Sequence, residues 1–73
     1  MTMYEIEFIR RVPGRDEPQV IDVYDMTSGR LGEVIFRAGL TLHTAKFRVR
    51  PETFRIREND GPVVFQSAAS TPS

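Results

Sequence analysis

The chain has 73 residues, with ten basic and ten acidic side chains, one histidine and no cysteine. This composition excludes disulfides, thiolate metal sites and cysteine nucleophiles, and a single histidine argues against a transition-metal site built by the protein alone. The balanced charge gives no net field that would attract nucleic acid or an anionic membrane. We therefore expect one small globular domain that needs no cofactor.

Location and stability are also constrained by the sequence. No apolar run approaches the roughly 20 residues that span a bilayer, and no basic region precedes an apolar stretch at the N-terminus, so a cytoplasmic protein is expected. A chain this short buries only about 60% of its unfolded surface. Self-association is an expected source of additional stability.

The first periodic segment is the sequence MYEIEFIRR, in which Tyr4, Ile6 and Phe8 alternate with Glu5 and Glu7. A period of two is typical of a strand with one buried face. The proline-containing and charged segment that follows, VPGRDEP, indicates a loop. The next segment, QVIDVYD, is rich in strand-forming residues and is expected to pair with the first.

Two faces of this second strand could point inward. One carries Ile21 and Val23, and the other carries Val20 and Tyr24. We favour the first face because it leaves Asp22 in solvent.

From Met26 the apolar period becomes helical. Apolar residues recur on one stripe of a helix at Leu31, Val34, Ile35, Ala38, Leu42 and Ala45. Thr27 or Ser28 could cap this helix, and with Thr27 as the cap Met26 and Leu31 occupy hydrophobic-staple positions. Pro51 prevents the helix from continuing.

The sequence does not decide where the helix ends, and the two alternatives are near Gly39 and near Arg48. Three glycines weaken the helical interpretation, and a helix that stops at Gly39 would leave 41–50 as a strand. A second alternative is a hairpin that turns at Ser28 and Gly29. We favour the long helix because several apolar spacings agree with it.

The C-terminal part predicts a second hairpin. Phe54 and Ile56 alternate with arginines, and Asp60-Gly61 is a favoured two-residue turn. Pairing across that turn places Ile56 opposite Phe65 and Glu58 opposite Val63. The domain is expected to cover 1–66, followed by a disordered tail at 67–73.

Together these elements predict a small α+β domain of order ββαββ, with one helix on one face of a four-stranded antiparallel sheet. The expected core residues are Tyr4, Ile6, Phe8, Ile21, Val23, Leu31, Val34, Ile35, Ala38, Leu42, Phe54, Ile56, Val63 and Phe65.

The phrase FRVRPETFRIRE, residues 47–58, contains two similar basic copies. If the copies paired as a hairpin, each face would mix arginine with apolar residues, or Arg48 would oppose Arg55. We therefore expect the first copy to be helix end and linker, and the second to be a strand.

Arginines provide the most suggestive candidate site. Arg48, Arg50, Arg55 and Arg57 could form a phosphate-binding face. Alternatively, Glu5 and Glu7 could pair with them as structural partners. Arg30, in TSGRLG at the predicted helix start, is a further candidate anion contact.

No catalytic pattern is present. His43 with Asp22, Asp25 and Ser28 provides acid, base and nucleophile types, but their spacing is not diagnostic, so no enzyme is predicted. We expect a non-catalytic domain that binds itself or another protein, through open strand edges and an uncovered sheet face. This face is expected to carry some of the apolar residues Val20, Tyr24, Ile9 and Val64 among its charges. Weak nucleic-acid or anion binding through the arginines is the alternative.

Overall fold

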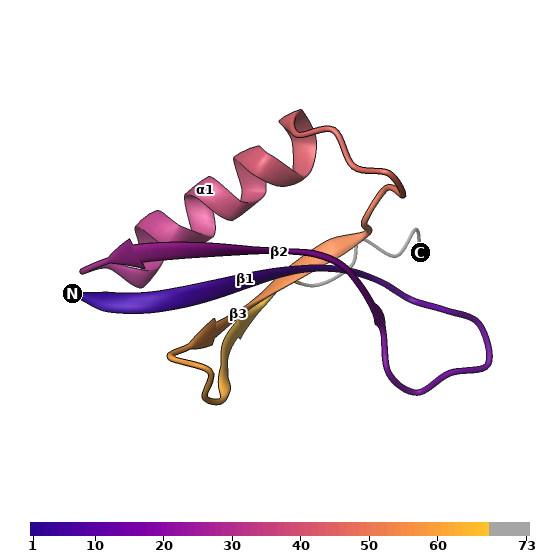
Figure 1. Ribbon diagram of the computed structural model, residues 1–73, viewed down its shortest axis with the longest axis horizontal. Helices are drawn as coiled ribbons and strands as arrows, with labels where there is room; N and C mark the ends of the chain where they lie inside the picture. The colour runs from indigo at the N-terminus through magenta and orange to yellow at the C-terminus, as the bar shows by residue number, and fades with distance from the viewer. Residues whose placement is uncertain (68–73) are drawn as a thin grey trace.

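The computed structural model describes residues 1–67. The elements are β1 (Thr2–Arg10), β2 (Gln19–Ser28), α1 (Leu31–Thr44), β3 (Thr53–Glu58) and β4 (Val63–Gln66). The strands form one antiparallel sheet in the order β2-β1-β3-β4, and α1 lies over one of its faces (Figure 1). The predicted ββαββ α+β fold is therefore confirmed. Most of the predicted tail, 68–73, lies outside the described residues.

The core is built between the two central strands and the helix. Its buried members alternate along β1 and β3 and follow one stripe of α1, as the two periods require. The buried cluster consists of Tyr4, Ile6, Phe8, Val34, Ala38, Phe54 and Ile56. Leu31, Ile35, Leu42 and Phe65 are partly buried against it. These positions agree with the predicted core.

The inward face of β2 differs from the favoured prediction. Tyr24 lies opposite Ile6, and its ring meets that of Phe8 edge-on at 5.3 Å between centroids, so Tyr24 is on the helix side. Val23 lies opposite Glu7 and is 46% exposed. The register shifts between Phe8 and Ile9, which leaves Ile21 as the additional, unpaired residue of a bulge.

The helix begins later than predicted, because β2 continues through Ser28. The N-cap residue is Arg30, which has extended backbone and no side-chain capping bond. Ser28 is buried, and its hydroxyl accepts the backbone N–H of Arg30 at 3.1 Å. Thr27 therefore belongs to a strand and does not cap α1.

The helix passes through Gly39 and ends at Thr44, so neither expected end point is correct. Ala45 already has extended backbone, with ψ of 153°. Residues 45–52 connect α1 to β3, and there Phe47 packs on Phe8 at 5.1 Å between ring centroids. Val49 lies in the same connection and is 39% exposed. The two basic copies do not pair with each other, as expected.

The β3–β4 turn is centred one residue earlier than predicted. Asn59 and Asp60 have φ of 49° and 60°, which is the type I′ arrangement, and the N–H of Gly61 donates to Glu58 at 2.7 Å. A Cβ at Gly61 would lie 2.8 Å from the Glu58 carbonyl oxygen, so the glycine is needed for this close approach.

The register predicted for this β3–β4 hairpin is correct at one end only. Ile56 lies opposite Phe65 as predicted. A shift after Ile56 places Val63 opposite Arg57 instead of Glu58. Val63 is consequently outside the core and 37% exposed, whereas Val64 is partly buried against the core.

Candidate functional site

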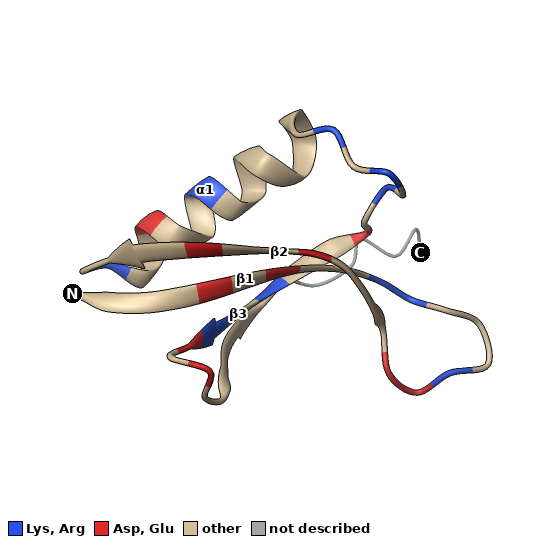
Figure 2. Cartoon of the chain, in the orientation of Figure 1, with Lys and Arg blue, Asp and Glu red and all other residues tan. Residues whose placement is uncertain are grey.

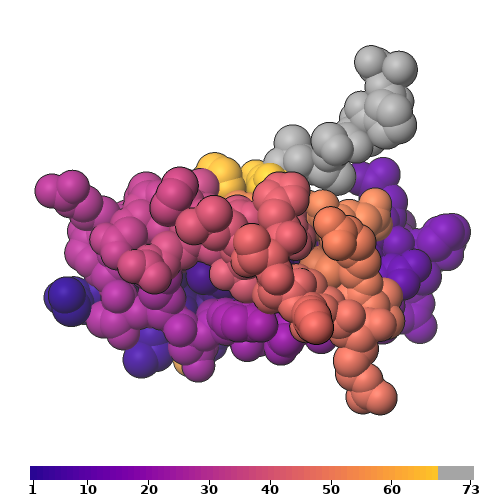
Figure 3. All heavy atoms as spheres, turned by 90° about the horizontal axis from the view of Figure 1, so that it is seen from above, coloured from indigo at the N-terminus to yellow at the C-terminus, as the bar shows by residue number. Residues whose placement is uncertain are grey.

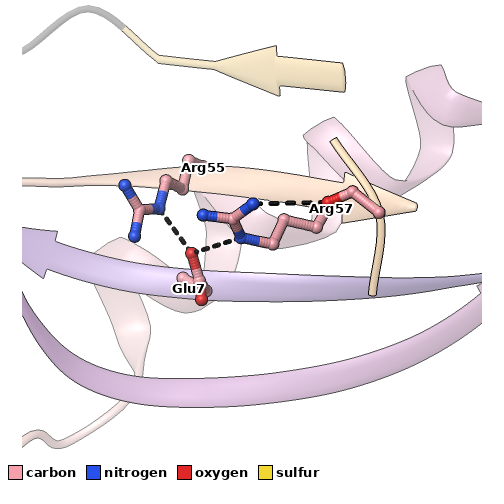
Figure 4. A network of polar contacts seen from close by, with 4 residues as sticks. Glu7, Arg55 and Arg57 are labelled. Atoms are coloured by element: carbon pink, nitrogen blue, oxygen red, sulfur yellow. Dashed lines mark hydrogen bonds and ion pairs between the residues drawn. The ribbon is translucent and has the colours of Figure 1, made fainter. Parts of the chain in front are cut away.

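The centre of the sheet face opposite α1 is occupied by three charged side chains. Glu7 of β1 lies beside Arg55 in the register, and its Oε1 accepts the Nε–H groups of both Arg55 and Arg57, the latter at 3.2 Å (Figure 4). Arg57 also donates to the carbonyl of Gly61 at 3.3 Å. The Glu7, Arg55 and Arg57 side chains are only 14%, 20% and 31% exposed. This ionic triad joins β1 to β3 and to the β3–β4 turn.

The triad confirms the expected pairing of Glu7 with Arg55 and Arg57, but the expected pairing of Glu5 with these arginines is not found among the described residues. Glu5 lies opposite Arg57, yet among the described residues it forms no ion pair with that arginine. A side-chain hydrogen bond to Asp60 is the main reason that the pKa of the Glu5 carboxyl is raised. Desolvation and electrostatic repulsion by Asp60, Asp25 and Glu7 raise this pKa further.

Substitution Glu5→Gln should therefore change how stability depends on pH. The folded-state pKa of Glu5 is raised, so its contribution is most favourable below the unfolded pKa and is lost as pH rises through the folded pKa. Glutamine preserves a donor toward Asp60 without the charge. Urea unfolding should show the variant to be more stable than wild type at pH 7, with the gain vanishing near pH 3. An equal effect at both pH values would contradict this assignment.

The other predicted arginines do not join the triad in one surface. Arg48 and Arg50 are exposed in the connection between α1 and β3, where basic residues gather beyond the end of the helix (Figure 2). Arg30 is exposed at the opposite end of α1, roughly 20 Å of helix away. The arginine site predicted from the sequence is thus split into three separate locations.

The residue types considered for catalysis are also separated. Ser28 is buried, and its hydroxyl is engaged with both the N–H and the carbonyl of Arg30. His43 lies in the last turn of α1, about 18 Å of helix further along. Asp22 is exposed on β2, where its Oδ1 accepts the N–H of Val23. Within residues 1–67, no group of three or more potential ligands is placed to hold a metal ion.

An apolar surface that sequence reasoning missed lies on the outer side of α1. Phe36 is 66% exposed and Leu40 is 50% exposed, one helical turn apart. The outer side of the helix faces the viewer in Figure 3, where none of the described segments covers it. The signal was present in the sequence, since residues 36 and 40 have helical spacing but fall opposite the core stripe.

The apolar sheet face expected from the sequence is mostly absent. Ile9 is 2% exposed, Tyr24 is on the helix side, and Val64 packs partly against the core. Val20 is exposed as expected, at 40%.

Comparisons with protein-family models, with curated proteins and with solved structures found no match. In the part of the chain that the structure describes, no helix is long and apolar enough to cross a membrane.

Proposed function

We propose that this protein is a cytoplasmic, non-catalytic domain that acts by binding a second copy of itself. One observation carries the proposal: Phe36 and Leu40 are exposed together on the outer side of the only helix among residues 1–67. Single exposed apolar residues are common on monomers, but a large aromatic and a leucine one turn apart form a contiguous apolar ridge.

The energetics of a small domain support the same proposal. Among residues 1–67, one helix covers one face of the sheet with a limited core, and the chain has no cysteine with which to form disulfides. Burial of apolar surface contributes about 25 cal/mol per Å², so covering Phe36 and Leu40 in a dimer adds stability that the monomer lacks.

The sheet face opposite α1 is less suitable for association. Its exposed apolar residues include Val23 on one edge strand and Val63 on the other. Two strands separate them, a distance of about 14 Å, and the ionic triad lies between. Covering this face would desolvate Glu7 and its arginines further, which costs free energy.

Sedimentation equilibrium tests the proposal at protein concentrations from about 10 µM to about 1 mM, the range in which a weak interface is populated. We expect the mean mass to rise with concentration and to level off at twice the monomer mass of 8.4 kDa. A mass that stays at the monomer value throughout this range would overturn self-association.

Nucleic-acid or anion binding is the second candidate, and the exposed Arg48 and Arg50 are what favour it. It is weaker than the first, because Glu7 already neutralises Arg55 and Arg57. Salt-titrated binding to single-stranded RNA and duplex DNA tests it. Binding that disappears in Arg48→Ala plus Arg50→Ala would support it, and absence of wild-type binding at low salt would exclude it.

A further inference from the structure

We propose that two copies pair antiparallel through one stripe of α1, which we call the outer seam: Glu33, Phe36, Leu40 and His43. The inference rests on the proposed self-association and adds the surface, the orientation and the register. All four side chains are exposed.

The outer seam has the spacing of a helix-pairing surface. Its residues are separated by three, four and three positions, which is the a/d repeat that lets one helix pack along another. This stripe is distinct from the core stripe, whose buried members are Val34 and Ala38. The helix thus has one seam that is used within the fold and a second that is open.

The order of residues in the outer seam is self-complementary in an antiparallel pair. Around a two-fold axis between Phe36 and Leu40, Phe36 faces Leu40 of the second copy, and Leu40 faces its Phe36. The same register places Glu33 opposite His43 of the second copy, at both ends. A two-fold interface requires that every contact occur twice in this way.

The end contacts are chemically compatible. An imidazole donates an N–H to a carboxylate in either of its protonation states, so Glu33 and His43 can bond across the interface. Within its own helix, the Glu33 carboxylate has only an exposed contact to Arg37 at 3.9 Å, with side chains 51% and 65% exposed. Glu33 is therefore able to accept a second donor.

One flank of the outer seam is open to close approach. Gly32 and Gly39 lie along it, and a Cβ added at either position would have no atom within 4 Å. A glycine inside a helix costs about 1 kcal/mol relative to alanine, and no close packing within the described residues repays that cost here. The absence of side chains on this flank permits a neighbouring helix to lie near the backbone.

The length of the helix limits the affinity. Fourteen residues extend about 21 Å, and a pair of such helices buries less than the roughly 1,200 Å² typical of stable interfaces. We therefore expect a dissociation constant in the micromolar range or weaker. Measurements must cover high protein concentration.

Truncation of the apolar pair is the first test. Phe36→Ala and Leu40→Ala should each weaken dimerisation by at least about tenfold in sedimentation equilibrium, because each change removes two central contacts. Both positions are exposed and alanine is the better helix former, so the monomer should still fold. Val23→Ala, at a 46% exposed position on the opposite sheet face, is the matched control and should leave the dissociation constant unchanged.

A charge exchange tests the register. Glu33→Lys and His43→Glu should each weaken the dimer several-fold, and the double variant should return within about twofold of wild type, because lysine then faces glutamate in both end contacts. The two positions are about 15 Å apart in one helix, so coupling between them can arise only across the interface.

The outcomes of these experiments distinguish self-association itself from the outer seam as the surface that mediates it. Persistent monomer overturns both self-association and the outer seam. A dimer that is weakened by Val23→Ala but not by Phe36→Ala supports self-association and overturns the outer seam. A dimer that depends on Phe36 and Leu40, with additive effects of Glu33→Lys and His43→Glu, overturns the antiparallel register.

Discussion

Substitution Phe8→Ala should remove a large part of the protein's free energy of unfolding, about 3–5 kcal/mol. Phe8 has no solvent exposure and is among the largest fully buried side chains of the fold. Its ring meets Tyr24 at 5.3 Å, Phe47 at 5.1 Å and Phe54 at 6.3 Å. Truncating a buried phenylalanine costs about 3–5 kcal/mol, whereas a domain of this length has a total stability of roughly 4–11 kcal/mol.

Two further variants make this prediction measurable. Phe8→Leu keeps most of the apolar volume and should lose only about 1–2 kcal/mol in urea unfolding followed by circular dichroism. Phe36→Ala is the matched control, because the same side chain is removed from a 66% exposed position, and the monomer should lose no stability. If Phe8→Ala and Phe36→Ala had equal midpoints at low concentration, the assignment of the core would be wrong.

Phe8 also shows why the sequence predicts the central layers of the fold. Alternation in β1 and helical spacing in α1 are enforced by burial, and both patterns are long enough to favour the correct type of element. The period of two alone therefore places Tyr4, Ile6 and Phe8 on one buried face. Val34 and Ala38 follow from the helical period in the same way.

The edge strand β2 could not be predicted as well. It carries apolar residues on both sides, and the rule that Asp22 should face solvent selected the wrong side. In the structure Asp22 lies on the helix side opposite Phe8, but near the end of the strand, where it remains exposed. The bulge at Ile21 then shifts the register, and no period of two can represent an unpaired residue.

The predicted ends of α1 were wrong for a different reason. Propensity did not show that Ser28 would be the last residue of a strand, with its hydroxyl fixed on the Arg30 backbone. At the other end, the chain leaves the helix after Thr44, and Phe47 packs on Phe8 of β1. Such contacts depend on residues distant in sequence, which local spacing does not contain.

The candidate site was predictable only in part. Matching period-two patterns in β1 and β3 correctly suggested that Glu7 pairs with arginine. The same patterns could not distinguish Glu7 from Glu5, because each lies opposite an arginine of β3 and a period of two does not contain the side-chain geometry that selects Glu7. Phe36 and Leu40 fall on the side of α1 opposite the core stripe, and the core stripe alone does not indicate that both are exposed together.

Substitution Glu7→Ala should destabilise the protein by about 2 kcal/mol, between the values for exposed and fully buried ion pairs. The change leaves Arg55 and Arg57 without their acid, two residues apart on one face of β3 and largely shielded from water. For a domain of this size, the melting temperature should fall by roughly 8–16 °C. Glu7→Gln keeps an acceptor oxygen and should lose less than Glu7→Ala.

Glu5→Ala is the appropriate control for this prediction. It removes the same side chain from the same face of β1, two residues away, but breaks no ion pair with Arg57 among the described residues. Because Glu5 is repelled by Asp60 and Asp25, its removal should leave the melting temperature unchanged or slightly raised at pH 7. Equal losses for the two variants would mean that the arginines do not depend on Glu7. A loss confined to Glu7→Ala would show that Glu7 holds Arg55 and Arg57 within the fold, so that these two arginines are not free to bind an external anion.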